Sequence, residues 1–226
     1  MLSAMRRFLA LSTRELVEQR PAGAGEDDVH FVEALVEAVV AEYTAPGDVV
    51  LDPFAGYGTT LAVSERMGRR AVGVELLPER VRATRRRAPS ATVIEGDARR
   101  LAELGIGAVD LCLTSPPYMT AANHPENPLT AYATRDGDYR TYLAQLAEVF
   151  GAAGRLLRPG GHLVVNAANL ETGGTVTPLA WDIAAAVAGE EHLSFRGEVY
   201  LHWDRPPPGV TGDYCLVFRA DAQPRQ

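Results

Sequence analysis

The chain has 226 residues and a formal net charge of −7, and 46% of its residues are hydrophobic. This length suffices for one domain with a full core, and the acidity argues against a large phosphate-binding surface of the kind that a stand-alone duplex binder needs. No apolar run approaches the length of a membrane span, and the apolar stretch within residues 1–11 is too short for a secretory signal, so we expect a cytoplasmic protein. Cys112 and Cys215 lie in separate strand-like runs without clustered histidines, which predicts neither a zinc site nor a disulfide framework.

The first 45 residues are predicted to be helical. Residues 12–19 have a helical composition, and residues 21–28 form a polar joint. In the helix that follows, apolar side chains recur at helical spacing, at Val32, Leu35, Val36, Val39, Val40 and Tyr43. Asp27 and Asp28 are expected to cap this helix, which should pack on a sheet.

Residues 52–60, Asp-Pro-Phe-Ala-Gly-Tyr-Gly-Thr-Thr, follow a strand-like apolar run and precede a helical segment. This pattern predicts a strand, a tight turn and a helix. Gly56 and Gly58 allow a sharp turn and let a ligand approach the main chain, while the N–H groups of the new helix point into the same space. Leu61 stands where the dinucleotide fingerprint has its third glycine, so that motif is excluded. A purely structural corner is the alternative interpretation.

Strands and helices then alternate, which is typical of a parallel sheet with right-handed crossovers. The predicted elements are a strand at 70–75, a helix at 78–87, a strand at 92–95 and a strand at 109–114. The last of these leads into Ser115-Pro116-Pro117-Tyr118, where two successive prolines exclude both a helix and a continuing central strand. The chain must therefore leave the sheet at Ser115.

The remaining residues predict a loop over the site and the far side of the sheet. Residues 119–137 are polar without an apolar period, and we expect them to form a mobile loop. The predicted elements after it are a helix at 138–157, a strand at 162–166, a helix at 178–188 and strands at 196–203 and 213–218. The closing pair is expected to be an antiparallel hairpin at the edge of the sheet.

Together, D-P-F-A-G-Y-G-T-T and T-S-P-P-Y resemble the amino-methyltransferases that transfer a methyl group from S-adenosylmethionine to an exocyclic nitrogen of a nucleobase, chiefly the DNA adenine-N6 and cytosine-N4 enzymes. The resemblance covers residues 29 to about 169. It implies an α/β fold with a doubly wound, mostly parallel seven-stranded sheet of the class I methyltransferase type and a C-terminal antiparallel hairpin. We expect a single domain, with N-terminal helices in residues 1–45 and the catalytic sheet in residues 46–226.

The same resemblance implies a cofactor site at the ends of the first three predicted strands. Asp52 would hold the ammonium of S-adenosylmethionine, Glu75 the ribose hydroxyls and Asp97 the adenine amino group. The other candidates for cofactor binding are Phe31, Phe54, Gly56, Gly58, Thr59, Ala98 and Thr114. The pair His30-Phe31 matches a family segment only loosely, and burial of Phe31 in the core explains it equally well. Glu75 and Asp97 could also be ordinary loop carboxylates.

Catalysis is expected at Ser115, Pro116, Pro117 and Tyr118, and no metal is implied. The lone pair of an aromatic amine is delocalised into its ring. The Ser115 hydroxyl and the Pro116 carbonyl can each accept one N–H and draw the nitrogen toward a tetrahedral shape, while Tyr118 offers a flat face for stacking. In the family, Asp at the Ser115 position is typical of adenine-N6 enzymes and Ser is commoner in cytosine-N4 enzymes, which favours cytosine.

Three interpretations of the acceptor stay open. The first is a nucleobase amine in DNA or RNA, the second is a small aromatic amine or nucleoside of a biosynthetic pathway, and the third is a non-catalytic cofactor-binding protein. Neither residues 119–137 nor the part after Asn169 is large enough for a separate target-recognition region. This favours the second interpretation. If the acceptor is a nucleic acid, we expect either an exposed or single-stranded base or a partner subunit that supplies recognition. The intact S-P-P-Y argues against the third interpretation.

Overall fold

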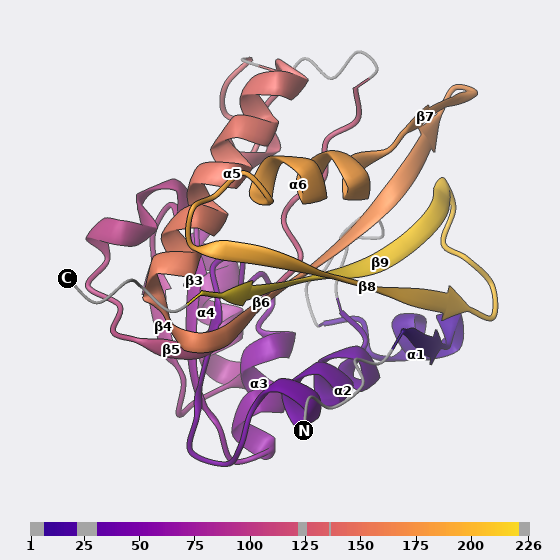
Figure 1. The fold of residues 1–226 in the computed structure, drawn as a ribbon. Coiled ribbons are helices and arrows are strands. Elements are labelled where there is room, and N and C mark those ends of the chain that lie inside the picture. Colours follow the sequence, from indigo (N-terminus) through magenta and orange to yellow (C-terminus); the bar gives the residue numbers. More distant parts are fainter. Residues whose placement is uncertain (1–6, 22–30, 122–125, 136, 222–226) are drawn as a thin grey trace.

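The computed structural model describes residues 7–21, 31–121, 126–135 and 137–221, and it shows one sheet with helices on both faces (Figure 1). The strands are β1 (Phe8–Leu11), β2 (Val49–Asp52), β3 (Arg70–Glu75), β4 (Thr92–Glu95), β5 (Val109–Thr114), β6 (Leu157–Thr172), β7 (Thr175–Thr177), β8 (Leu193–Trp203) and β9 (Val210–Ala220). The helices are α1 (Thr13–Glu18), α2 (Glu33–Tyr43), α3 (Thr59–Arg66), α4 (Pro78–Arg87), α5 (Tyr139–Leu156) and α6 (Leu179–Val187), with 3-10 helices η1 (Ala98–Glu103) and η2 (Pro128–Thr130). Within those ranges, no helix is long and apolar enough to cross a membrane.

The strands that the structure describes form one sheet in the order β1-β8-β9-β6-β5-β2-β3-β4, with β7 paired to β6. The strands β4, β3, β2, β5 and β6 are parallel, and β9 is antiparallel to both β6 and β8. This confirms the predicted doubly wound sheet with its antiparallel C-terminal pair. The strand order reverses beside β2, which lies between β3 and β5, and such a switch point is where ligands bind in open α/β sheets.

One of the two strands beyond the predicted seven lies at the N-terminus. β1 pairs in parallel with β8, with Phe8 opposite Tyr200, although only helices are predicted for residues 1–45. A short apolar run does not distinguish a strand from a helix, and the open edge of β8 supplies the partner that decides between them. The β8–β9 hairpin is therefore not at the edge of the sheet, because β1 lies outside it.

The other additional strand, β7, pairs with the far end of β6. β6 has 16 residues, whereas the sequence predicts a strand only at 162–166. Arg158-Pro159-Gly160-Gly161, the residues between the predicted helix at 138–157 and the predicted strand at 162–166, already belong to this strand. The extension brings Asn169 beside β9, opposite Gly212, while Asn166 at the end of the predicted strand lies opposite Cys215.

Helices α2 and α3 cover one face of the sheet, and α5 and α6 cover the other (Figure 1). The predicted stripe of α2 is confirmed, because its central side chains Leu35, Val36, Val39 and Val40 are buried. Asp27 and Asp28, predicted to cap this helix, lie outside the described residues. β2 is buried along its whole length, as expected for a central strand with both faces covered. This core fixes the strand ends on which the candidate site is built.

Candidate active site

A cavity of about 330 Å³ lies at the carboxyl ends of β2, β3, β4 and β5. It is lined by Pro53, Phe54 and Gly56 after β2, by Val74 to Leu77 and Arg80 at β3 and α4, by Gly96, Asp97 and Ala98 after β4, by Ser115 to Tyr118 after β5, and by Pro128, Leu129, Ala131 and Tyr132. The two sequence motifs therefore meet in one cavity, although they are about 60 residues apart in the chain.

The glycines of the turn after β2 serve different purposes. Gly56 has φ +53° and Gly58 has φ +79°, and both values lie in the left-handed region that favours glycine. A Cβ on Gly56 would make only an ordinary van der Waals contact, 3.9 Å from the main-chain oxygen of Phe54, whereas a Cβ on Gly58 would lie 2.6 Å from Cγ2 of Thr84. Gly56 thus leaves room beside the cavity, and Gly58 allows the turn to pack closely against α4.

Glu75 lies at the end of β3 and is 7% exposed. Its Oε2 accepts a hydrogen bond from the Gly56 N–H at 2.8 Å, and its Oε1 accepts one from the Leu77 N–H, also at 2.8 Å. Burial raises the pKa of this carboxyl group, while the two N–H donors and the nearby Arg80 act in the opposite direction. A carboxylate has about four acceptor positions, so the side chain can still accept a hydrogen bond from a ligand in the cavity.

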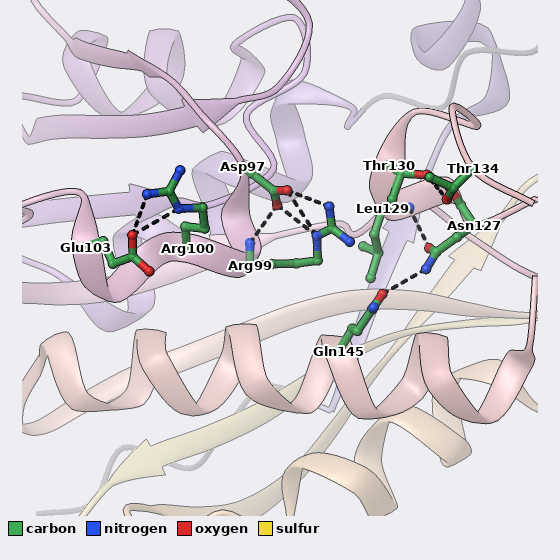
Figure 2. A network of polar contacts seen from close by, with 9 residues as sticks. All are labelled: Asp97, Arg99, Arg100, Glu103, Asn127, Leu129, Thr130, Thr134 and Gln145. Carbon is green, nitrogen blue, oxygen red and sulfur yellow. Dashed lines mark hydrogen bonds and ion pairs between the residues drawn. The ribbon is translucent and has the colours of Figure 1, made fainter. Parts of the chain in front are cut away.

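Asp97 lines the cavity one strand further along the sheet. Its carboxylate accepts hydrogen bonds from the main-chain N–H of Arg99 at 2.9 Å and from the Arg99 guanidinium at 2.6 to 3.1 Å (Figure 2). Burial alone would raise the pKa of Asp97, but the donors of Arg99 outweigh it and hold the pKa below its usual value. The group is therefore ionised at neutral pH and able to accept from an amino group.

Part of the predicted loop also lines the cavity, through Pro128 and Leu129 of η2 and through Ala131 and Tyr132. Asn127 is buried, accepts a hydrogen bond from the Leu129 N–H at 3.0 Å and donates one to Gln145 of α5 at 2.8 Å (Figure 2). Asn followed by Pro is a common helix start, and this signal in the sequence could have predicted η2. The described part of the loop is thus fastened to α5, while residues 122–125 and 136 lie outside the described residues.

The S-P-P-Y segment is held from two sides. The buried Tyr142 of α5 donates a 2.9 Å hydrogen bond to the main-chain oxygen of Pro117. The Tyr118 hydroxyl lies 3.4 Å from the Ser115 hydroxyl and 3.4 Å from the main-chain oxygen of Asn166. Burial, with a smaller contribution from Asp213, raises the pKa of Tyr118 far above its usual value, so the ring stays neutral.

Asp52 does not line the cavity, although the sequence predicts that it holds the cofactor's ammonium. It is 2% exposed, and its Oδ1 accepts hydrogen bonds from Thr114 Oγ1 at 2.6 Å and from the Phe54 N–H at 3.0 Å. Burial raises its pKa to about 6, against the effect of these donors. In the structure this carboxyl group joins the end of β2 to the end of β5.

Four more of the predicted cofactor-binding residues also lie outside the cavity wall. They are Phe31, Gly58, Thr59 and Thr114. Phe31 is buried among the apolar side chains under α2, which agrees with its interpretation as a core residue, and its neighbour His30 lies outside the described residues. Thr59 accepts a 2.8 Å hydrogen bond from Arg87. Phe54, Gly56, Glu75, Asp97 and Ala98 do line the cavity.

The cavity fits a nucleoside-containing cofactor. The carboxylates of Glu75 and Asp97 stand at neighbouring strand ends and face the cavity, where they can accept hydrogen bonds from the hydroxyls and the amino group of such a ligand. The missing Cβ at Gly56, which lines the cavity, lets a ligand come close to the main chain. Among the described residues, no cluster of His, Cys, Asp and Glu could hold a metal ion.

An open sheet in this strand order, with the cavity at the switch point, has the class I fold of S-adenosylmethionine-dependent methyltransferases. It is similar to a TehB-like methyltransferase from Corynebacterium glutamicum, with a TM-score of 0.57 and 14% identity over 92% of this chain and 94% of that one. It is also similar to the N-methyltransferase NodS from Bradyrhizobium japonicum, with a TM-score of 0.57 and 15% identity over 84% of this chain and 94% of that one. At these identities the likeness establishes the fold.

Sequence comparison confirms the predicted resemblance to the DNA methylase family, whose model matches residues 19–86. The chain is 34% identical over 151 residues to the 4-amino-L-phenylalanine/4-methylamino-L-phenylalanine methyltransferase of Streptomyces pristinaespiralis, covering 62% of this chain and 48% of that protein. It is 36% identical over 75 residues to the type II methyltransferase M2.DpnII of Streptococcus pneumoniae, covering 33% of this chain and 28% of that protein. The chain thus matches less than half the length of either relative.

Proposed function

We propose that this chain is an S-adenosylmethionine-dependent N-methyltransferase that acts on an amino group attached to an aromatic ring. The observation that carries the proposal is that Glu75 and the S-P-P-Y segment line one cavity. The family match and the methyltransferase fold support the reaction class and the cofactor. When bound, the cofactor supplies a methyl group that is already activated by its sulfonium.

The side chains around the cavity have distinct tasks in this proposal. Glu75 accepts hydrogen bonds from the ribose hydroxyls, and Asp97 accepts one from the adenine amino group. The Ser115 hydroxyl and the Pro116 carbonyl accept the N–H groups of the acceptor, so that the nitrogen becomes tetrahedral and its lone pair is free to take the methyl group. Tyr118 stacks on the aromatic ring of the acceptor and holds it in line.

A small aromatic amine is the acceptor that we favour. Of the two relatives described above, the one with the longer match is an enzyme named for an aminophenylalanine, which carries its amine on a benzene ring. The net charge of −7 also disfavours strong binding to a phosphate backbone. The second candidate is a nucleobase amine, which the DNA methylase match supports, and Ser115 then favours cytosine-N4 over adenine-N6.

The acceptor class is tested by incubating the purified protein with labelled S-adenosylmethionine and a panel of acceptors. The panel holds 4-amino-L-phenylalanine, aniline, cytidine, adenosine, single-stranded DNA, duplex DNA and tRNA, and Ser115→Ala is the control. We expect label in a small aromatic amine that disappears in the control. Label only in nucleic acid would replace the favoured acceptor by the second candidate. Intact cofactor binding without transfer to any of these would favour the non-catalytic interpretation.

A further inference from the structure

A buried polar network joins β6, β8 and β9 behind the S-P-P-Y segment. Asp213 of β9 is 8% exposed and Asn166 of β6 is 7% exposed. Asp213 Oδ1 accepts a 2.7 Å hydrogen bond from Asn166 Nδ2, and its Oδ2 accepts a 2.8 Å hydrogen bond from Trp203 Nε1. Neither Asp213 nor Asn166 lines the cavity, so this carboxylate is no direct ligand of what binds there.

The network reaches the catalytic segment through the main chain of Asn166. The main-chain oxygen of Asn166 lies 3.4 Å from the Tyr118 hydroxyl, and the amide of the same residue is fixed by Asp213 and by a 3.1 Å hydrogen bond to the main-chain oxygen of Tyr214. The Tyr118 hydroxyl in turn lies 3.4 Å from Ser115 Oγ. A continuous series of polar contacts thus runs from the indole of Trp203 to the hydroxyl of Ser115.

The direction of these hydrogen bonds matters for the reaction. The carbonyl of Asn166 can only accept, so the Tyr118 hydroxyl donates its proton to it. The lone pairs of that hydroxyl are then free to accept the proton of Ser115. With its own proton directed at Tyr118, the Ser115 oxygen offers only lone pairs to an acceptor amine, which is the state that the proposed function needs.

A carboxylate is an expensive group to bury, and a brace between strands does not need one. Removing an ionised carboxyl from water costs free energy that its hydrogen bonds must offset, and apolar residues of similar size often hold two strands at least as well. Asp213 nevertheless stands at this point, and its charge acts on the neighbouring Tyr118. A functional role of the carboxylate in the candidate active site would explain this placement.

We propose that Asp213 is a positioning residue for methyl transfer, which holds Asn166 and thereby orients the hydroxyls of Tyr118 and Ser115. Trp203 supports it by donating to its second oxygen. The kinetic part of this inference rests on the proposed function, whereas the coupling between Asp213 and Tyr118 does not. A mere brace between strands would affect stability but not the link to Tyr118.

The coupling is tested without any acceptor by a double-mutant cycle on urea unfolding. The variants are Asp213→Asn, Tyr118→Phe and the double variant, each of which changes one polar group at nearly constant size. We expect the effects on the unfolding equilibrium constant to be non-additive by threefold or more, since the two side chains share Asn166.

The same cycle with Asp110→Asn in place of Asp213→Asn is the control. Asp110 likewise accepts two hydrogen bonds, from the main-chain N–H of Val49 and from the side chain of Arg158, but it lies at the amino ends of the strands. The control cycle should give additive effects. Additive effects in the Asp213 cycle as well would overturn the proposal.

The kinetic test uses 4-amino-L-phenylalanine as the probe acceptor. We expect Asp213→Asn to lower kcat tenfold or more, with little change in the KM of the probe or in calorimetric affinity for S-adenosylhomocysteine, and Trp203→Phe to have a smaller effect of the same kind. Trp181→Phe, the other tryptophan of the chain, should behave as wild type. An unchanged kcat in Asp213→Asn would overturn the inference. If wild-type protein does not methylate the probe, the favoured acceptor fails, and the double-mutant cycle alone decides the role of Asp213.

Discussion

The main-chain N–H of Gly56 donates a 2.8 Å hydrogen bond to the carboxylate of Glu75, and this contact joins the turn after β2 to the end of β3. The other oxygen of Glu75 accepts from the N–H of Leu77, just before α4 begins. Glu75 therefore shapes the cavity wall as well as facing the cavity. A change at this position should alter both the turn and the binding of the cofactor.

Glu75→Gln is expected to weaken binding of S-adenosylhomocysteine by about 1.5–3 kcal/mol, because the amide has one acceptor oxygen where the carboxylate has two. Isothermal titration calorimetry measures the change. Glu95→Gln is the matched control, since Glu95 lies opposite Glu75 on β4 but is exposed and outside the cavity wall. Wild-type affinity in Glu75→Gln would mean that the ribose hydroxyls are not bound there.

Ser115→Ala is expected to lower kcat tenfold or more and to leave cofactor affinity within about twofold of wild type, because the lost acceptor matters when the nitrogen becomes tetrahedral. Steady-state kinetics with the acceptor found in the panel measures both. Ser64→Ala, a buried serine in α3 away from the cavity, should leave kcat unchanged. An equal loss in both variants would point to general damage to the fold.

Tyr118→Ala is expected chiefly to raise the KM of the acceptor, because it removes the ring on which the acceptor stacks. Tyr118→Phe keeps that ring and removes only the hydroxyl, so it should lower kcat with a smaller effect on KM. The two variants thus separate stacking from orientation of Ser115. If both changed KM and kcat alike, the two roles could not be assigned to different parts of this side chain.

Gly58→Ala is expected to lower the free energy of unfolding by about 2–4 kcal/mol. The left-handed backbone contributes about 1–2 kcal/mol of this cost and the overlap with Thr84 contributes the rest. Gly105→Ala is the control that measures the cost of the left-handed backbone alone, because Gly105 has φ +67° and a Cβ there would have no neighbour within 4 Å. Adding Thr84→Ser removes the closest contact of the new Cβ and should restore part of the loss, as urea unfolding can measure. If the double variant were no more stable than Gly58→Ala, the cost of the left-handed backbone would account for the whole loss.

The stability of the protein should depend on pH through Asp213. Burial raises the pKa of Asp213 to about 6 from 3.8, so between these values the folded chain keeps a proton that the unfolded chain has released. The free energy of unfolding of wild type should therefore fall by about 2–3 kcal/mol, relative to Asp213→Asn, as pH rises from about 4 to about 6, and change little above that. Urea unfolding of both proteins at pH 4, 5, 6 and 7.5 measures the difference between their free energies of unfolding. The contributions of the titratable groups that both proteins share cancel in this difference. A difference that does not vary with pH would contradict the raised pKa.

The alternation of strands and helices could be predicted from the sequence because it depends on local patterns. The apolar run before Asp52 and the helical stripe of α2 each need only their own residues to be recognised. The turn at Gly56 and Gly58 is marked by residues that tolerate a left-handed backbone, and the paired prolines mark the end of β5. Two such motifs were enough to indicate the fold and the reaction class that the comparisons support.

The direction in which Asp52 points could not be predicted, because it depends on a partner on another strand. Its carboxyl group hydrogen-bonds to Thr114, 62 positions away, instead of lining the cavity. The part of the cavity wall formed by Pro128 to Tyr132 likewise depends on the contact between Asn127 and Gln145. In each case the local sequence allows several conformations, and the contact selects one.

By itself, the sequence determined where β2 and β5 end and which turns open toward a ligand, since steric limits on glycine and proline act within a few residues. The tertiary structure alone decided that β1 joins the sheet beside β8 and that Asp213 stands behind Tyr118. The physical reason is that a strand edge and a buried carboxylate gain free energy only from the groups placed opposite them. Those groups are brought there by the pairing of β6, β8 and β9, which no local pattern in the chain encodes.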